Sequence, residues 1–369
     1  TSSPISAAIM ALIIPFVGLV TVSLRRSIMF VYLPSMRKCS TFRILLITLL
    51  LGFFLADISA QSKYWVSFAD KPRCELSPQN ILSERAIQRR IRNNIPVLTE
   101  TDMPINLEYV STIKGRVDSL GHSSKWLNGV SVWASADQAS ELKEIAWVKE
   151  VICMQMTDCP LMSKDEPELS THHQAILQSQ TEIMGAESFK QASLDGKGVL
   201  IAVFDVGFRG VDERKEFGHL LLNNRILHCH DFISNDDDVY AWGTHGTNVL
   251  SCIAGISDGK AIGLATGASF ALARTERNLW ETIGEEDSWL AAAEWADSLG
   301  VDVINSSLGY TNNRYFWKDL DGQHTLVSRA AQMAFEKGIV VVNATGNDGD
   351  TDWEYLGAPA DAPGGLAVG

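Results

Sequence analysis

The run VLIAVFDVG at residues 199–207 decides the fold class of the C-terminal half of the chain. Its apolar residues follow one another without polar alternation, which is typical of a strand buried on both faces of a parallel sheet. Its unbroken apolar part ends at Asp205, and Gly207 lets the chain turn away. Functional groups of open parallel sheets collect at the carboxyl ends of strands. Asp205 is therefore a candidate site residue, although a turn-capping aspartate is the simpler interpretation when it is taken alone.

The same pattern recurs towards the C-terminus. Strands are predicted at 269–273, 301–305 and 339–343, and helices at 180–191, 287–299 and 326–336. Strands that alternate with helices indicate an α/β domain with a doubly wound, mostly parallel sheet over residues 180–369.

A histidine and an asparagine stand at two further predicted element ends. Residues 241–255 read AWGTHGTNVLSCIAG, so His245 lies between two Gly-Thr pairs at the start of a predicted helix. A histidine that takes a proton from a hydroxyl needs a buried carboxylate on its other ring nitrogen, and Asp205 could supply it. Asn347 follows the strand predicted at 339–343 and could donate a hydrogen bond to a developing oxyanion. Taken alone, Asn347 reads more simply as a surface residue in a turn.

Residues 61–156 are predicted to form a separate small α+β unit. Strands are expected at 63–69, 107–113, 126–134 and 147–153, and helices at 82–91 and 136–145. This βαββαβ order is the split, ferredoxin-like arrangement. The basic cluster of this unit is expected to be a solvated helix face; it comprises Arg85, Arg89, Arg90 and Arg92. Residues 157–179 are polar and acidic and are predicted to be a linker.

The first sixty residues carry two apolar segments. Residues 36–60 have a basic start, a short apolar middle and the small residues Ser59 and Ala60 at the end, which is typical of a signal peptide. Residues 1–35 are predicted to be an upstream or leader segment, with a membrane anchor as the alternative, because 5–24 is uncharged and long enough to span a bilayer. We therefore expect a secreted or extracytoplasmic protein that meets a membrane only through this leader.

Charge and composition narrow the classes of partner and cofactor. The formal net charge of −13 disfavours nucleic acid as a partner, since phosphate binding needs a basic face. The acidic loop at residues 235–238 lacks the alternating ligand spacing of a calcium loop and is expected to be a solvated turn. No cofactor and no metal site are predicted; a structural calcium ion is conceivable but has no defined motif.

Four segments, in this order, resemble the subtilisin-like serine peptidases. They read IAVFDVG (201–207), HGTNVLSCIAG (245–255), VDVINSSLG (301–309) and VVVNATGNDG (340–349). The resemblance implies that Asp205 and His245 are two members of a catalytic triad and that Asn347 is the oxyanion donor. It also implies that Ser307, Leu308 and Gly309 form the edge that pairs with the substrate backbone.

The unit at 61–156 resembles the propeptides of the same family, which implies an intramolecular inhibitor that caps the substrate cleft. Residues 157–179 would then hold the processing region. Two departures stand out: the family's nucleophile lies in a Gly-Thr-Ser motif, which occurs nowhere in residues 1–369, and Val206 follows Asp205 where the family often has Ser or Thr. We expect the serine beyond residue 369, in a chain that is truncated before it.

The preferred hypothesis is the precursor of a secreted serine endopeptidase that cleaves polypeptides through an Asp-His-Ser triad. A non-catalytic subtilisin-fold module that binds peptides is the alternative, and the downstream reading frame discriminates between the two. A dinucleotide-binding oxidoreductase is disfavoured because Gly196 and Gly198 precede the strand, whereas phosphate-binding glycines follow it.

Overall fold

The computed structural model describes residues 61–154, 181–277, 285–311, 315–347, 349 and 353–369. The predicted leader and signal peptide at 1–60 and the predicted linker at 157–179 lie outside the described residues. Within the described ranges, no helix combines the length and the apolar character that crossing a membrane requires.

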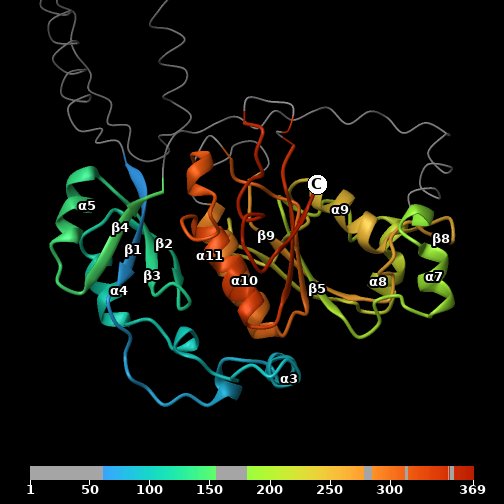
Figure 1. Cartoon of the computed structure of the whole chain (residues 1–369), viewed down its shortest axis with the longest axis horizontal. Helices are drawn as coiled ribbons and strands as arrows, with labels where there is room; N and C mark the ends of the chain where they lie inside the picture. Colours follow the sequence, from blue (N-terminus) through green and yellow to red (C-terminus); the bar gives the residue numbers. More distant parts are fainter. Residues whose placement is uncertain (1–60, 155–180, 278–284, 312–314, 348, 350–352) are drawn as a thin grey trace, which may run out of the picture. The chain divides into compact units, whose positions relative to one another are not determined.

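The N-terminal module, as residues 61–154 are called here, is built on a four-stranded antiparallel sheet of order β2-β3-β1-β4 (Figure 1). Its strands are β1 (Ser62–Phe68), β2 (Ser119–Ser124), β3 (Gly129–Ala134) and β4 (Val148–Cys153), and its helices α3 (Glu84–Arg92), α4 (Leu107–Lys114) and α5 (Ala136–Lys143). The first strand pairs antiparallel with the third and the fourth. This is the predicted ferredoxin-like arrangement.

Two elements of the N-terminal module differ from the prediction. Residues 107–113 belong to helix α4, because the Asn106 side chain caps it by accepting the N–H groups of Glu108 and Tyr109. The second strand is β2 instead, whose sequence SLGHSS is too polar to be recognised as a strand. Strand β3 begins only at Gly129, and Trp126 is buried in the turn before it.

The C-terminal module, residues 181–369, is built on a six-stranded parallel sheet of order β12-β11-β10-β5-β9-β6. Its strands are β5 (Leu200–Asp205), β6 (Ile226–Asp231), β9 (Ser269–Arg274), β10 (Val303–Ser306), β11 (Val340–Ala344) and β12 (Leu366–Val368), with a small hairpin of β7 (Ile256–Ser257) and β8 (Lys260–Ala261). Its α-helices are α7 (Ala186–Gln191), α8 (Gly218–Leu222), α9 (His245–Ala254), α10 (Glu285–Leu299) and α11 (Leu326–Glu336). The predicted doubly wound parallel sheet is confirmed. Edge strand β6, with the sequence ILHCHD, escaped the prediction because half of its residues are polar.

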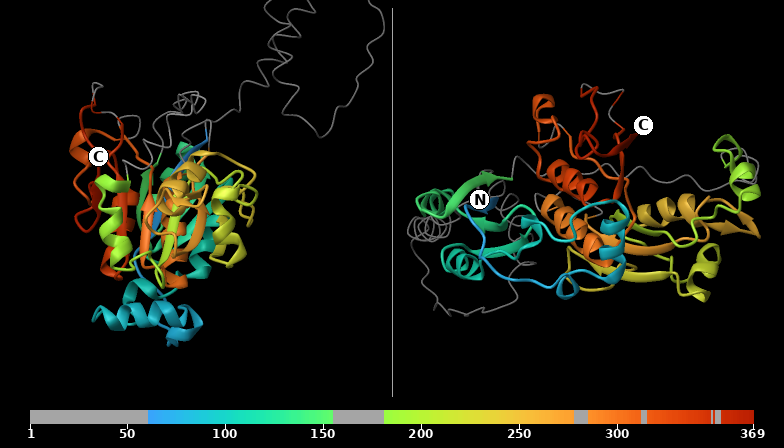
Figure 2. Two further views of the ribbon diagram at one scale, coloured as in Figure 1. Left: turned by 90° about the vertical axis from the view of Figure 1, so that its right-hand side faces the viewer. Right: turned by 60° about the horizontal axis from the view of Figure 1, so that its bottom comes forward.

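Strand β5 is buried on both faces, which explains its unbroken apolar run. Helices pack against both faces of its sheet (Figure 2). Ala202 and Phe204 belong to the core that includes residues of α10 and α11. Ile201 and Val203 belong to a second core on the opposite face, with residues of α8 and α9.

The two modules share one hydrophobic core. Trp65 and Trp126 of the N-terminal module lie in the same buried cluster as Phe204 and Trp289 of the C-terminal module. The rings of Phe204 and Trp289 meet edge to face, with 5.4 Å between their centroids. A buried ion pair joins the two modules as well, with 2.8 Å between the Lys63 ammonium and the Asp287 carboxylate.

The basic cluster of the N-terminal module is only partly a solvated face, so that prediction was wrong for two of its residues. Arg89 and Arg90 are 1% and 0% exposed and pair with Asp297 of α10. Arg92 keeps 65% of its side chain exposed. A buried charge needs a partner of opposite charge. Here that partner is distant in the sequence, and the hydrophobic periodicity of a single helix does not reveal it.

Leu272→Ala is expected to lower the free energy of unfolding by about 2 to 5 kcal/mol, because it opens a cavity in β9 at a fully buried position. The matched control is Leu107→Ala, at a site that is 75% exposed, with an expected effect within about 0.5 kcal/mol. Urea unfolding followed by tryptophan fluorescence measures both. Equal losses for the two variants would contradict the assigned core.

Candidate active site

Asp205 and His245 meet at the carboxyl edge of the parallel sheet. Asp205 is the last residue of β5 and His245 the first of α9. The His245 ring nitrogen Nδ1 lies 2.9 Å and 3.0 Å from the two carboxylate oxygens of Asp205. The Asp205 side chain is fully buried, whereas that of His245 is 53% exposed. The carboxylate therefore orients an imidazole that solvent can reach.

Glycines allow this close approach of helix and strand. A Cβ atom at Gly246 would lie 2.5 Å from the Gly207 carbonyl oxygen and 2.9 Å from the Cβ of Asp205. Gly243 has a φ of +51°, and a Cβ there would lie 2.7 Å from the Val206 side chain. These glycines beside His245 thus set the helix start directly against the end of β5.

Burial raises the pKa of Asp205, while the hydrogen bonds from His245 and from the Val206 N–H favour its charged form. The Val206 nitrogen lies 2.8 Å from Oδ1. The backbone thus supplies a donor that holds the carboxylate in place.

Arg274 is a neighbour of this site that the sequence analysis missed. It ends strand β9, where it lies opposite Asp205 in the register of the sheet. Its Nε donates to the Val206 carbonyl at 3.1 Å, and its guanidinium pairs with the buried Asp231 at 2.7 Å and stacks over Trp242. The sequence did carry a signal for Arg274, because a charged residue directly follows the apolar strand predicted at 269–273. The same signal pointed to Asp205.

The remaining predicted site residues follow the neighbouring strands β10 and β11. Residues 307–309 come directly after β10, which pairs with β5; Leu308 is buried, and Gly309 has open space beside its backbone. Asn347 follows β11 and is exposed. All of these residues come after the carboxyl ends of adjacent strands, at the same edge as Asp205.

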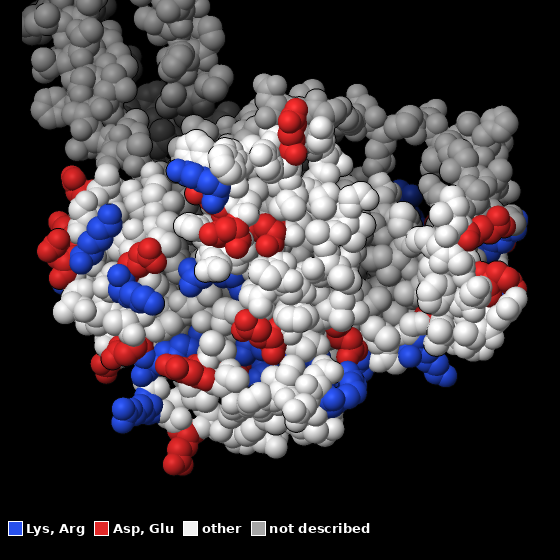
Figure 3. Space-filling model, in the orientation of Figure 1, with Lys and Arg blue, Asp and Glu red and all other residues white. Residues whose placement is uncertain are grey.

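The acidic loop at 235–238 is a series of turns in which carboxylates accept backbone N–H groups. Asp238 accepts from Tyr240 and Ala241, and Asp236 accepts from Asp238. Across the residues that the structure describes, His, Cys, Asp and Glu side chains form no group of three or more that could hold a metal ion. On the face shown in Figure 3, basic side chains lie scattered among acidic ones, without one continuous basic patch.

Two family models match the chain in tandem. Residues 63–171 match the peptidase S8 propeptide domain of Bacteroidota, and residues 196–369 match the subtilase family. The two matches together span most of the chain.

The curated relatives match at most about half of the chain. The chain is 28% identical over 197 residues to the minor extracellular protease Vpr of Bacillus subtilis, and the match covers 50% of the chain and 22% of Vpr. It is 33% identical over 159 residues to a thermophilic serine proteinase of Bacillus sp. strain AK1 (42% of the chain, 34% of the relative) and 30% identical over 178 residues to subtilisin E of Bacillus subtilis (47% and 41%). The chain thus spans less than half the length of each of these relatives.

A solved structure shows the same fold over both modules. The epidermin leader peptide processing serine protease EpiP of Staphylococcus aureus aligns with a TM-score of 0.51 and 17% identity, over 84% of this chain and 69% of that one.

Gly246→Ala is expected to lower the free energy of unfolding by about 1 to 3 kcal/mol and to lengthen the contact between His245 Nδ1 and Asp205, because the new methyl group meets backbone and side-chain atoms at under 3 Å. Gly218→Ala is the matched control, since that helical glycine has open space around it. Urea unfolding and the imidazole NMR resonances of His245 measure the effect. A Gly246→Ala variant as stable as the control, with unchanged resonances, would show that the close approach is not needed.

Proposed function

We propose that this chain, which belongs to the subtilase (peptidase S8) family and carries its propeptide domain, is the precursor of a secreted serine endopeptidase. The observation that carries the proposal is the contact between the buried Asp205 carboxylate and the solvent-accessible His245 imidazole at the carboxyl edge of the sheet. That pair is what a serine hydroxyl needs for activation.

In the proposed mechanism, the Nδ1–H of His245 donates to Asp205, which fixes the tautomer and stabilises the imidazolium once it forms. The Nε2 of His245 takes the proton of the serine hydroxyl as that oxygen attacks the substrate carbonyl, and later gives it to the leaving amine. Asn347 donates to the developing oxyanion, a contribution of about 3 to 4 kcal/mol in comparable sites. No metal or cofactor has a role in these steps.

The proposed substrates are extended polypeptides. Residues 307–309 come directly after β10, and the open space beside Gly309 leaves its backbone approachable. A substrate strand could pair there through main-chain hydrogen bonds, as in other cases of strand addition. The propeptide is proposed to inhibit the enzyme until it is removed.

Export is proposed on two grounds. Residues 36–60 have the pattern of a signal peptide, and the relatives include the minor extracellular protease Vpr and the alkaline serine exoprotease A of Vibrio alginolyticus.

His245→Ala in the product of the complete reading frame is expected to reduce cleavage between residues 157 and 179 at least about 10⁴-fold, because the general base is lost. Mass spectrometry of the purified product over time measures the cleaved fraction. His324→Ala serves as control, since His324 is an exposed residue that pairs only locally with Asp321. Normal self-cleavage of His245→Ala would remove this residue from the mechanism. Intact precursor for both the unaltered protein and the variant would favour the non-catalytic module.

Residues 61–369 alone are expected to show no turnover of a chromogenic peptide, since they contain no Gly-Thr-Ser motif. Steady-state absorbance assays check this. Turnover that His245→Ala abolishes would mean that the nucleophile lies within this segment.

A further inference from the structure

The N-terminal module carries an extension that its ferredoxin-like unit does not need. Residues 71–106, called the arm here, connect β1 to α4 and contain the short helix α3 and the 3-10 turns Pro78–Asn80 and Glu100–Asp102. Ser83 caps the start of helix α3: its side chain accepts the Ala86 N–H, and its own N–H donates to the Ser298 carbonyl of α10 at 2.9 Å. The arm is thus tied from its first turn to the C-terminal module.

The arm lies against the C-terminal ends of two helices. Gly300 follows α10 and Gly338 follows α11, with φ of +82° and +85°. A Cβ at Gly300 would lie 2.5 Å from the Ala86 nitrogen, and one at Gly338 would lie 2.6 Å from the Asn93 side chain. Both ends of α3 therefore touch a helix-terminating glycine.

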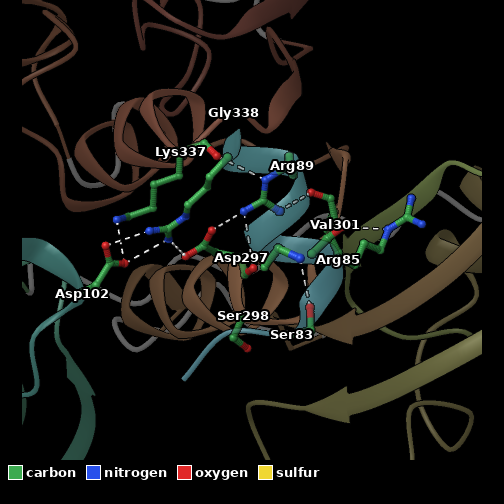
Figure 4. A network of polar contacts seen from close by, with 12 residues as sticks. Ser83, Arg85, Arg89, Asp102, Asp297, Ser298, Val301, Lys337 and Gly338 are labelled. Atoms are coloured by element: carbon green, nitrogen blue, oxygen red, sulfur yellow. Dashed lines mark hydrogen bonds and ion pairs between the residues drawn. The ribbon is translucent and has the colours of Figure 1, made fainter. Parts of the chain in front are cut away.

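Arg89 links these two helix ends (Figure 4). Its guanidinium donates to the carbonyl oxygens of Val301 at 2.6 Å, Lys337 at 3.2 Å and Asp297 at 3.4 Å, and it also pairs with the Asp297 carboxylate. The last carbonyls of a helix lack partners within it and carry partial negative charge. The side chain of Arg89, fully buried, supplies donors and positive charge to both helix ends at once.

Arg90 and Asp102 complete the buried charge cluster. Arg90 pairs with Asp102 at 2.8 Å and with Asp297 at 2.6 Å. Lys337 of the C-terminal module reaches back to Asp102 at 2.9 Å. Burial by itself would raise the pKa of Asp102, but the hydrogen bonds and charges of Arg90 and Lys337 outweigh it and hold this pKa well below its usual value. Asp102 thus stays ionised in this buried contact.

The arm contact uses other residues of the N-terminal module than the sheet contact does. In the sheet contact, Ser124 and the Trp126 N–H donate to Glu294, and Lys63 pairs with Asp287. The arm contact uses α3 and Asp102 instead. Loss of one contact therefore leaves every donor and acceptor of the other in place.

We propose that the arm is a second docking element of the propeptide, in which Arg89 binds the C-terminal ends of α10 and α11 and keeps the propeptide on the C-terminal module after the chain is cut between them. The occupant of this surface is helix α3, whose consecutive residues Arg89 and Arg90 both pair with Asp297. The inference rests on the proposed function in one respect: it assumes that the chain is cut between the two modules.

The test uses the full chain with a recognition sequence for a site-specific protease inserted between residues 157 and 179. After cutting, gel filtration and hydrogen exchange follow the dissociation of the two modules. Arg89→Met is expected to speed dissociation about 100-fold, because it removes the donors that Arg89 gives to Asp297 Oδ1 and to the Val301 and Lys337 carbonyls in a buried site. Asp297→Asn is expected to act in the same direction from the other side. Arg89→Lys is expected to fall between, since an ammonium cannot reach all three carbonyls.

Arg92→Met is the matched control, because Arg92 lies on the same helix with its side chain 65% exposed; its effect is expected to stay within about threefold. In the Arg89→Met chain before cutting, amides of α3 should exchange faster while those of β1 and β9 keep their protection. An unchanged dissociation rate in Arg89→Met, or exchange that rises equally in α3 and β9, would overturn the proposal. These readouts need no catalysis by the chain, so an inactive enzyme would refute the proposed function and leave the docking result standing.

Discussion

Buried carboxylates on helix α10 are the constraint on which the joining of the two modules depends. Asp287 and Asp297 are fully buried and Glu294 is half-buried where the N-terminal module covers the helix, and a buried charge is tolerated only with partners. Lys63, Ser124 and Arg89 supply those partners from three separate places in the sequence. The N-terminal module is therefore held by polar complementarity as much as by the tryptophans it contributes to the shared core.

A second constraint governs the candidate active site. The Asp205 carboxylate lies at the end of a strand that is covered on both faces, so its environment is dry and its orientation is fixed by the backbone N–H of Val206. The imidazole comes from a helix that can approach only because glycines stand on either side of it. The Asp205 carboxylate is kept from water, whereas the His245 ring is open to it. Proton transfer at a hydroxyl requires this asymmetry.

The parallel sheet could be predicted because each central strand is apolar on both faces, and Asp205 and His245 could be singled out because chemistry gathers where such strands end. Helix α4 was missed since its residues 107–113 have strand-like apolar spacing while the decisive signal, the Asn106 cap, is local and easily overlooked. Strand β2 was missed because an edge strand can be polar. Arg89 and Arg90 were misread for another reason: their shared partner Asp297 lies more than two hundred residues away, and nothing in the sequence of a basic helix reveals so distant a carboxylate.

The three carboxylates of α10 also fix the number of residues that can lie between them. At about 100° per residue, positions 287, 294 and 297 fall within an arc of about 80°, and at 1.5 Å per residue the outer two are about 15 Å apart. A single residue inserted between Asp287 and Asp297 would turn one end of this stripe by about 100° relative to the other. The sheet contact and the arm contact could then no longer be made together. The spacing of the acidic residues along helix α10 thus sets the register between the two modules.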